Sequence, residues 1–307
     1  MTFFIGFDIG GTKCAVSLGK WFNQEIEILE REEVPTKDDP YETFDELAPF
    51  VSQWVDKFNV KSAGISCGGP LDSKKGVIIS TPNLSSKWHG LEIVAYIRSR
   101  FGLSAKLEND ANACAVAEWK FGAGKGAKNL VFMTFGTGLG AGLILDGKLY
   151  SGTNGNAGEI GHVRLEQDGP MGYNKIGSAE GFCSGNGIKR LALIRARENG
   201  VSIDDDITTK IIFEKARENN DFFVSVVQES AEKFARVISI LIDLFNPEII
   251  VVGGVFMRNY DVFMPILTPI VERESLADSC KVCKILPAKI GENIGDYAAL
   301  ALAVMEE

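Results

Sequence analysis

The chain has 307 residues, of which 45% are apolar and 24% are charged, with 33 glycines and 10 prolines. This length exceeds the roughly 100–200 residues of one typical domain, so we expect two domains that meet at a cleft. The 32 lysines and arginines against 41 aspartates and glutamates give a net charge of −9, which repels a phosphate backbone. Composition and charge therefore exclude a disordered chain and a small disulfide module, and they argue against nucleic acid as the main partner.

The chain starts with a short apolar stretch, Met1–Phe7, which Asp8 interrupts and no basic segment precedes. No run approaches the about 18 apolar residues of a membrane-spanning helix. We therefore expect no membrane partner and a cytoplasmic location.

The six cysteines are sparse for this length. Cys14, Cys67 and Cys114 each lie alone in an apolar segment, which is typical of buried reduced thiols. Cys280 and Cys283 have the spacing of a metal or redox pair, but no second pair or histidine accompanies them. We interpret these two as incidental thiols.

The first half of the chain mixes strand-like apolar runs with segments of helical spacing, as in an α/β domain. The predicted strands are 3–7, 14–18, 25–34, 62–66, 76–80 and 105–108, and the predicted helices are 43–58, 91–101 and 111–121. A glycine-rich break at 122–127 then ends the helical pattern, and we place a hinge there.

The second half begins with two strands, passes a glycine-rich loop at 152–161 and then becomes helical. The predicted strands are 130–135, 140–145 and 248–252. The predicted helices are 187–199, 208–219, 222–245, one from 260 and, after residues 284–287, 295–305. We expect the last helix, which is rich in alanine, to pack back against one of the domains.

A weak internal repeat relates the two halves. Residues 4–18 and 131–145 share one design, in which a tight turn of glycine and threonine joins two apolar strands. Glycine allows positive φ and lets backbone N–H groups approach an anion, while threonine adds a hydroxyl donor. Either turn alone is equally well explained as a simple connection. Its recurrence at the head of both halves favours phosphate binding, with both turns facing one polyphosphate.

Two common nucleotide motifs do not fit. Neither Gly124-Lys-Gly nor Gly147-Lys-Leu supplies the hydroxyl that follows the lysine of a Walker A loop. Residues 136–141 match Gly-x-Gly-x-x-Ala with Glu159 about twenty residues on, but a dinucleotide fingerprint must open a helix, and residues 141–148 are predicted as a second strand. Gly253 and Gly254, after the strand 248–252, offer bare backbone to a base or ribose.

Six motifs occur in order over nearly the whole chain: 8–13 (Asp-Ile-Gly-Gly-Thr-Lys), 68–70 (Gly-Gly-Pro), 82–84 (Pro-Asn-Leu), 108–112 (Glu-Asn-Asp-Ala-Asn), 136–138 (Gly-Thr-Gly) and 158–162 (Gly-Glu-Ile-Gly-His). Together they resemble the ROK sugar kinases of the actin-like ATPase-domain superfamily. The resemblance implies an α/β fold with two actin-like, or ribonuclease H-like, domains around a deep cleft. The first would be 1–121, carrying the sugar site and first hairpin and joined by the terminal helix 291–307. The second would be 122–290, carrying the second hairpin, the nucleotide site and a sugar loop.

The resemblance also implies a sugar site. Asp110 matches the catalytic base, a carboxylate that takes the proton of a sugar hydroxyl as its oxygen attacks the γ-phosphorus. From the sequence alone, the pair Asn109 and Asp110 is a helix N-cap, and both roles can coexist. The positions that match sugar-binding ones are Gly69, Asn83, Asn109, Asp110, Glu159, His162 and Glu180. Their amides and carboxylates suit sugar hydroxyls.

For the nucleotide, Asp8 resembles the aspartate that contacts phosphate and magnesium, acting through water because Mg²⁺ keeps several waters in such sites. The residues implied to bind ATP are Asp8, Gly10, Gly11, Thr12, Lys13, Thr134, Gly136, Thr137, Gly138, Gly253 and Gly254. Lys13 is alternatively a solvated strand residue. ATP and Mg²⁺ are thus the expected donor and cofactor.

One departure from the family concerns zinc. Many relatives carry three cysteines after the histidine of the last motif, and these four residues bind a structural zinc. Here the cysteine positions are Met171, Tyr173 and Ser178, none of which is a plausible zinc ligand. We expect no structural zinc, a loop held by packing, and His162 free to bond sugar or carboxylate.

The function implied is an ATP-dependent kinase for the primary hydroxyl of a hexose, with glucose as the first candidate. Kinases for N-acetylmannosamine, N-acetylglucosamine, allose, fructose or a β-glucoside are alternatives that the sequence does not separate. Another class of relative is the sugar-sensing transcriptional repressor, which carries a helix-turn-helix domain ahead of the kinase-like body. A strand predicted from Phe3 leaves no room for one, and the acidic charge disfavours DNA. A non-catalytic sugar-binding protein is the third option. The resemblance suggests a homodimer.

Overall fold

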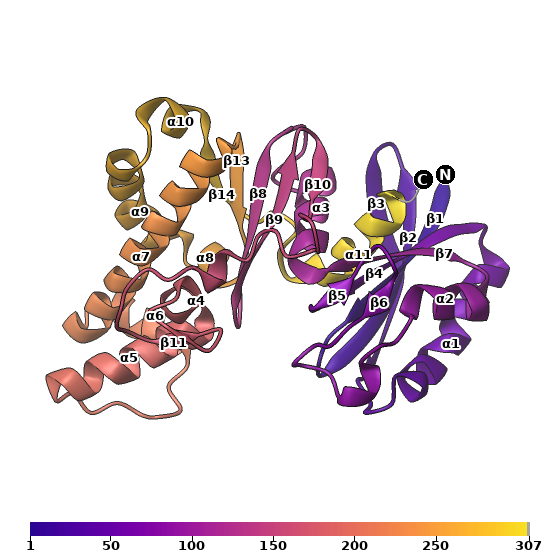
Figure 1. Cartoon of the computed structure of the whole chain (residues 1–307), viewed down its shortest axis with the longest axis horizontal. Coiled ribbons are helices and arrows are strands. Elements are labelled where there is room, and N and C mark those ends of the chain that lie inside the picture. The colour runs from indigo at the N-terminus through magenta and orange to yellow at the C-terminus, as the bar shows by residue number, and fades with distance from the viewer. Residues whose placement is uncertain (306–307) are drawn as a thin grey trace. The chain divides into compact units, whose positions relative to one another are not determined.

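The structure, a computed structural model, describes residues 1–305 and divides into two compact units. Unit 1 consists of Met1–Gly126, Leu149–Ala157 and the chain from Lys289 onwards, and unit 2 consists of Ala127–Lys148 and Gly158–Ala288. Each unit contains one five-stranded sheet (Figure 1), so the predicted α/β class is confirmed. The domain boundaries inferred from the sequence stay a prediction.

The sheet of unit 1 combines a meander with parallel strands. In spatial order its strands are β3 (Glu25–Pro35), β2 (Lys13–Phe22), β1 (Thr2–Ile9), β4 (Val60–Cys67) and β7 (Ser104–Asn109). β1 pairs antiparallel with β2 and parallel with β4, and β4 pairs parallel with β7. The register aligns Ile9 with Cys67 and Cys67 with Asn109, so the carboxyl ends of three strands meet at one edge of this sheet.

Helices cover both faces of this sheet. α1 (Pro40–Lys57) and α2 (Ile93–Phe101) pack on one face, against Phe7 and Ile65 among others. α3 (Asp110–Phe121) and α11 (Ile294–Met305) pack on the other (Figure 1). A Cβ at Gly64 would lie 1.9 Å from the carbonyl oxygen of Ala299, so glycine in β4 lets the alanine-rich α11 approach the strand backbone. The terminal helix thus packs on the sheet of unit 1.

Unit 2 repeats the strand pattern of unit 1. Its sheet order is β10 (Lys148–Tyr150), β9 (Leu139–Leu145), β8 (Leu130–Phe135), β13 (Ile249–Val252) and β14 (Lys284–Pro287). β8 pairs antiparallel with β9 and parallel with β13, as β1 pairs with β2 and β4. The internal repeat seen in the sequence is thus a repeat of topology.

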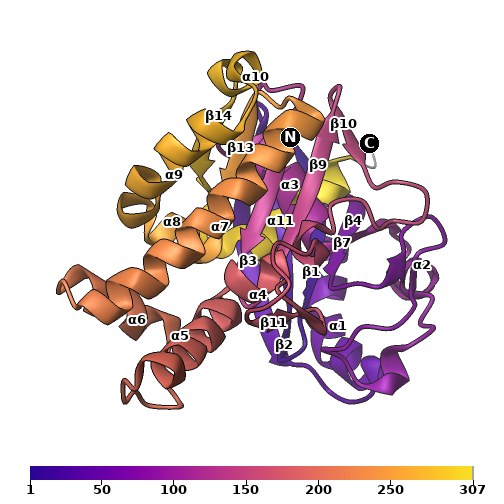
Figure 2. The ribbon, with the colours of Figure 1, turned by 60° about the vertical axis from the view of Figure 1, so that its left-hand side comes forward.

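The remaining elements of unit 2 are mostly helical: α4 (Ala179–Phe182), α5 (Gly185–Asn199), α6 (Thr209–Arg217), α7 (Asp221–Phe245), α8 (Gly254–Arg258), α9 (Tyr260–Glu274) and α10 (Ala277–Val282). Figure 2 shows α7 running along this layer, where it contacts α5, α6 and α9. A cluster of phenylalanines joins the layer to β8, with ring centroids of Phe135 and Phe234 4.9 Å apart and those of Phe135 and Phe263 5.5 Å apart.

Short elements complete the chain: β5 (Leu71–Asp72), β6 (Val77–Ile78), β11 (Met171–Gly172), β12 (Lys175–Ile176), and 3₁₀ turns at Ser86–Trp88, Ile160–His162 and Gly291–Asn293. The strand predicted at 76–80 is therefore only the two-residue β6. The helix predicted from 43 starts earlier, because Asp39 caps it by accepting a hydrogen bond from the N–H of Tyr41 and proline is favourable in the first turn.

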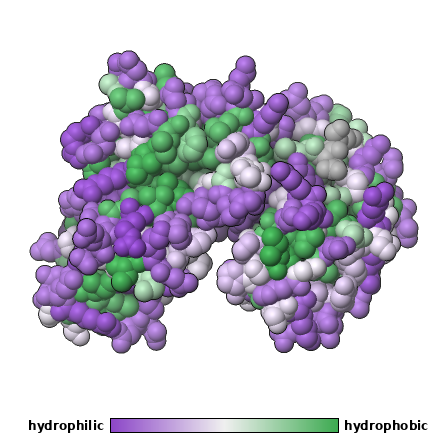
Figure 3. Space-filling view, in the orientation of Figure 1, coloured by the Kyte–Doolittle hydropathy of each residue, from purple (hydrophilic) through white to green (hydrophobic). Residues whose placement is uncertain are grey.

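The surface in Figure 3 is largely hydrophilic, with hydrophobic patches over the region of α7 and α9. The most exposed apolar side chains near it are Leu244, Leu276 and Val282, which are 69%, 65% and 57% exposed. Residues 1–305 contain no helix with the length and apolarity to cross a bilayer. All six cysteines are free thiols; four are buried, while Cys280 and Cys283 are partly exposed.

Candidate active site

The edge of the unit 1 sheet at the carboxyl ends of β1, β4 and β7 collects most of the residues predicted for that unit. Asp8 is near the end of β1, Gly69 follows β4, and Asp110 follows β7 directly. A Cβ at Gly69 would lie 3.1 Å from Nδ2 of Asn109, so these two predicted residues are neighbours. In open α/β sheets, this edge is where ligands bind.

Asn109 and Asp110 together start α3. The side chain of Asn109 is the N-cap and accepts a hydrogen bond of 2.9 Å from the N–H of Ala111, and Oδ1 of Asp110 accepts from the same N–H at 2.8 Å. Asp110 is exposed. Asp110 thus places a carboxylate at the N-terminus of α3, where the helix dipole favours negative charge.

Glu108 supports this pair and was not singled out from the sequence. It is 3% exposed, and its Oε1 accepts hydrogen bonds from Oγ of Ser73, the N–H of Asn109 and Nδ2 of Asn112, at 3.1, 2.9 and 3.1 Å. A buried carboxylate is stable only when its acceptors are used in this way. A charged residue inside an apolar strand pattern was the available signal.

The carboxyl group of Asp8 is buried close to other acidic groups, which disfavours its ionised form. Burial, followed by the nearby charges of Asp296 and Asp110, raises its pKa to about 6, although Arg31 and Lys13 act in the opposite direction. A Cβ at Gly295 would lie 2.2 Å from Oδ2 of Asp8, so the carboxylate packs against the first turn of α11. Asp296 in turn accepts hydrogen bonds from Ser17 Oγ at 2.7 Å and Arg31 Nε at 2.9 Å. An added cation would relieve the repulsion at Asp8.

The first turn, which joins β1 to β2, is closed by a hydrogen bond of 3.0 Å from the N–H of Gly10 to the carbonyl of Lys13. Within residues 1–305, the N–H groups of Gly11 and Thr12 have no acceptor, and both residues are exposed. A Cβ at Gly11 would lie 2.4 Å from the carbonyl oxygen of Asn83, so the predicted sugar residue Asn83 is adjacent to this turn. Lys13 pairs with Glu33 at 2.8 Å.

The second turn, which joins β8 to β9, has different supports. Oγ1 of Thr134 accepts from the N–H of Gly140 at 2.9 Å, and Oε2 of Glu180 accepts from the N–H of Leu139 at 3.1 Å. A Cβ at Gly138 would lie 2.6 Å from that Glu180 oxygen. Because β9 follows the turn as a strand, the segment opens no helix, and the dinucleotide fingerprint is excluded on structural grounds.

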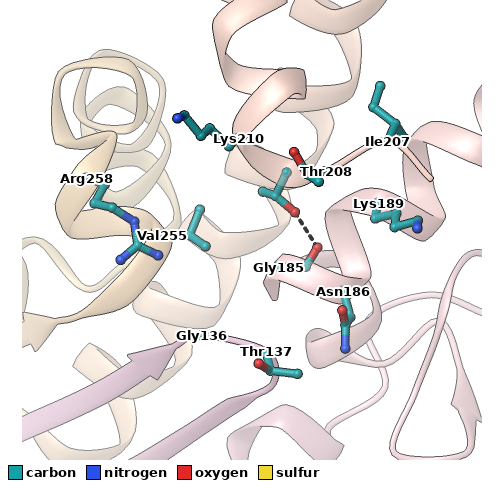
Figure 4. Close-up of a pocket in the computed structure, with 11 residues that line it drawn as sticks. Gly136, Thr137, Gly185, Asn186, Lys189, Ile207, Thr208, Lys210, Val255 and Arg258 are labelled. Atoms are coloured by element: carbon teal, nitrogen blue, oxygen red, sulfur yellow. Dashed lines mark hydrogen bonds between the residues drawn. The ribbon is translucent and has the colours of Figure 1, made fainter. Parts of the chain in front are cut away.

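A pocket of about 570 Å³ adjoins the second turn within unit 2. Gly136 and Thr137 line it from the hairpin, Asn186 from the start of α5 and Val255 from α8 (Figure 4). The other lining residues are Gly185, Lys189, Ile207, Thr208, Thr209, Lys210 and Arg258. Oγ1 of Thr209 donates to the carbonyl of Gly185 at 2.6 Å and ties α6 to α5. The volume of this pocket is in the range of small-ligand sites, roughly 300–1,000 Å³.

Of the lining residues, only Gly136 and Thr137 were predicted from the sequence, because the others lie on separate segments of the chain and share no motif. Gly253 and Gly254 do not line the pocket, although Val255 does. Gly254 has φ of 63°, and a Cβ there would lie 2.1 Å from the carbonyl oxygen of Phe135. Glycine at 254 therefore allows α8 to start against the end of β8.

The predicted sugar residues of unit 2 gather around the hairpin β11–β12. The hydroxyl of Tyr173 donates to Oε2 of Glu159 at 2.8 Å, and Nζ of Lys175 is 2.9 Å from Nδ1 of His162. Oε1 of Glu180 accepts from the N–H of Tyr173 at 3.1 Å. The carboxylate of Glu180 thus braces both this hairpin and the second turn.

The positions of the family's zinc-binding cysteines have other bonds here. Ser178 is buried, and its Oγ donates to the carbonyl of Gly172 at 2.9 Å and accepts from the N–H of Gly181 at 3.1 Å. Met171 is 46% exposed. Thioether, phenol and an engaged hydroxyl do not form the set of thiolate and imidazole ligands that structural zinc requires. These residues therefore do not fit the metal.

The fold is of the two-sheet α/β class, and in each sheet a glycine–threonine turn joins the first two strands, which are antiparallel. The ROK family profile matches residues 4–306, and the chain belongs to the ROK family.

Among curated relatives, the glucokinase of Streptomyces coelicolor is 31% identical over 97% of this chain and 96% of its own length. The N-acetyl-D-glucosamine kinase of Vibrio cholerae is 30% identical over 98% and 99%. Among solved structures, a ROK family glucokinase from Streptomyces griseus in complex with glucose and AMPPNP is 30% identical with a TM-score of 0.78, covering 99% of both chains. A ROK family transcriptional regulator has a TM-score of 0.86 at 24% identity, over 98% of this chain and 77% of its own, which shows the shared fold.

Proposed function

We propose that this chain is an ATP-dependent sugar kinase that phosphorylates the primary hydroxyl of a hexose, with glucose as the preferred acceptor. The observation that carries the proposal is the edge of unit 1. There, Asp110, the first glycine–threonine turn and the adjacent Asn83 share one sheet edge. A proton acceptor beside free N–H donors is the minimum equipment for phosphoryl transfer.

In the proposed reaction, Asp110 accepts the proton of the sugar hydroxyl as its oxygen attacks the γ-phosphorus of ATP. Gly69, Asn83, Asn109, Glu159, His162 and Glu180 bind the other hydroxyls. Each of the two turns binds nucleotide phosphate. The residues are Gly10, Gly11, Thr12 and Lys13 in the first turn, and Thr134, Gly136, Thr137 and Gly138 in the second. Their donors stabilise the charge that spreads over the transferred group. The pocket lined by Thr137 receives the nucleoside, and Gly253 and Gly254 place the start of α8, with its lining residue Val255, beside it.

Mg²⁺ fits this scheme through Asp8, whose charge is destabilised by its neighbours. Among residues 1–305, no three histidines, cysteines, aspartates or glutamates surround a single metal position. Mg²⁺ at Asp8 would therefore be held mainly by water and phosphate oxygens, as it is in many nucleotide sites. When bound, it would supply neutralising charge to the phosphates.

The test is an assay of ADP release with ATP and a panel of hexoses and N-acetylhexosamines, with the product identified by mass spectrometry and ³¹P NMR. We expect the highest kcat/KM with glucose and a product phosphorylated at the primary hydroxyl. Preference for N-acetylglucosamine or N-acetylmannosamine would change the substrate but keep the class. If no sugar is phosphorylated while calorimetry detects sugar binding, the chain is a sugar-binding or regulatory member of the family and the proposal fails.

Two further expectations from the resemblance belong to the proposal: a cytoplasmic location and a homodimer. The exposed Leu244, Leu276 and Val282 at the end of α7 and around α10 support self-association, because large exposed apolar side chains that cluster mark interaction surfaces. Light scattering behind size-exclusion chromatography measures the oligomeric state, and a monomer at micromolar concentration would contradict the dimer.

A further inference from the structure

The hairpin β11–β12 of unit 2 turns at an unfavourable residue. Tyr173 and Asn174 are its two central residues, with φ of 53° and 55°. A two-residue turn with positive φ at both positions suits asparagine, but a bulky aromatic residue is rare in this conformation. A residue that is costly for the backbone persists where its side chain has another use.

The side chain of Tyr173 contacts two of the residues predicted to bind sugar. Its hydroxyl donates to Oε2 of Glu159 at 2.8 Å, and its ring meets the ring of His162 edge to face, with centroids 5.6 Å apart at 88°. Its N–H donates to Glu180 at 3.1 Å. Tyr173 is thus anchored at its backbone while its ring and hydroxyl orient Glu159 and His162.

Lys175, two residues on, holds His162 at two points. Its Nζ donates to the carbonyl oxygen of His162 at 2.8 Å and lies 2.9 Å from Nδ1 of the ring. A lysine ammonium has donors only, so Nδ1 must be the acceptor. The ring proton is then on Nε2, and His162 can offer an N–H to a sugar oxygen.

We propose that Lys175 and Tyr173 are positioning residues that replace the family's structural zinc: the ammonium of Lys175 sets the tautomer of His162, and the hydroxyl of Tyr173 orients Glu159. Met171, Tyr173 and Ser178 do not fit zinc. Instead of the metal ion, the ammonium group of Lys175 lies at Nδ1 of His162. The inference rests on the proposed function, because Glu159 and His162 matter to activity only if the site binds a sugar.

The first test needs no sugar. His89 and His162 are the two histidines of the chain, so ¹⁵N-histidine NMR of the full-length protein in weakly alkaline buffer gives two ring signals, which His89→Gln assigns. We expect the Nε2–H tautomer at His162 and a shift towards a tautomer mixture in Lys175→Met. Lys148→Met, at an exposed lysine of β10, is the matched control and should leave the signal unchanged. An unaltered His162 signal in Lys175→Met overturns the role of Lys175.

The second test separates binding from turnover. Tyr173→Phe keeps the ring and removes the donor to Glu159, so the KM for the sugar should rise about 2–10-fold, the worth of one hydrogen bond, while kcat changes less than about twofold. Tyr150→Phe is the control: Tyr150 is 50% exposed and Tyr173 48%, and the hydroxyl of Tyr150 has no hydrogen-bond partner in the described chain. An unchanged KM, or a fall in kcat alone, overturns the role of Tyr173.

The third test concerns the metal. Elemental analysis of the purified, dialysed protein should find far less than one zinc per chain, and added Zn²⁺ should not change the His162 signal. Stoichiometric zinc that survives a chelator overturns the replacement. A protein that phosphorylates no sugar would refute the proposed function, but the tautomer and zinc measurements would still decide this inference on their own.

Discussion

The two glycine–threonine turns have the same strand pattern and different supports. In the first turn, Gly11 packs against backbone: a Cβ at this position would lie 2.4 Å from the carbonyl oxygen of Asn83. In the second turn, Gly138 packs against the end of a side chain: a Cβ at this position would lie 2.6 Å from a carboxylate oxygen of Glu180. A backbone neighbour cannot move without its strand or loop, whereas a carboxylate can rotate.

The surroundings differ as well. Asp8, Lys13, Asp110 and Asp296 place ionisable groups around the first turn, which suits proton and charge transfer. The second turn opens instead into a pocket whose walls carry Lys189, Lys210 and Arg258. We therefore expect mutation of Asp110, beside the first turn, to affect the reaction, and mutations in the pocket beside the second turn to affect nucleotide binding.

The largest effect is expected from Asp110→Asn. The amide keeps the size of the side chain but cannot accept the proton, so kcat should fall about 10³-fold, within the range for loss of a general base. The Kd for sugar, measured by calorimetry, should stay near the native value. Asp205→Asn, at an exposed aspartate outside the site, is the control. Unimpaired turnover by Asp110→Asn would remove Asp110 from its role and with it the division of tasks between the turns.

The next effect compares the turns directly through stability. Gly11→Ala must displace the backbone at Asn83 and should lower the free energy of unfolding by about 2–3 kcal/mol, as overpacking does. Gly138→Ala should cost less, about 1–1.5 kcal/mol, because the carboxylate of Glu180 can rotate away, although it then loses the hydrogen bond from the N–H of Leu139. A Cβ at Gly136 meets nothing within 4 Å, so Gly136→Ala should keep the native free energy of unfolding. Urea denaturation of the three variants measures the order, and equal losses for Gly11→Ala and Gly138→Ala would show that the two supports are equally rigid.

The hairpins could be predicted because their determinants are local. Period-two apolar residues flank the glycine and threonine of each turn, and no distant contact is needed to form the pair. Helix boundaries were less accurate where caps decide them: Asp39 moves the start of α1, and Ser184 accepts from the N–H of Gly187 to start α5. The meeting of the carboxyl ends of β1, β4 and β7 at one sheet edge could not be predicted, because it depends on the pairing register of these strands, which the sequence does not show.

The site was predictable as far as its motifs reach. Asp8 and Asn109 lie on strands that end at one edge of the sheet, and Asp110 follows Asn109 directly as the first residue of α3. Glu108 and the far wall of the pocket were missed, because their roles come from contacts with Ser73 and between separate helices. The hairpin β11–β12 was also missed, since its turn at Tyr173 contradicts ordinary turn preferences.

A smaller effect, with a defined pH dependence, is expected at Asp8. Its folded pKa of about 6 lies above the ordinary 3.8, so the neutral form is favoured in the fold. Below pH 3.8 both states are protonated and no cost arises. As the pH rises through 6, the folded protein must ionise a carboxyl that the unfolded chain ionises freely, and stability is lost.

Asp8→Asn should therefore be more stable than the wild type by about 3 kcal/mol at pH 8, with the gain fading towards pH 4, while turnover is lost. Urea denaturation across that pH range, with Asp205→Asn as the control, measures the gain. A gain that is the same at both ends of the range would show that repulsion at the first turn is not what distinguishes it from the second.

The smallest effect on stability is expected at Lys13, and it decides between the two interpretations of that residue. The Lys13–Glu33 pair is exposed, so Lys13→Met should change the free energy of unfolding by less than about 0.5 kcal/mol. Lys20→Met is a matched control on the same strand, because Lys20 pairs across to Glu27 at 3.1 Å.

If Lys13 leaves Glu33 for a bound phosphate, the KM for ATP should rise about tenfold in Lys13→Met and stay unchanged in Lys20→Met, since a lost charge-assisted contact is worth about 1.5 kcal/mol. Equal KM values in the two variants would make Lys13 a solvated strand residue, and the proposed phosphate contacts of the first turn would then be its backbone N–H groups and Thr12, as we propose for Thr137 in the second.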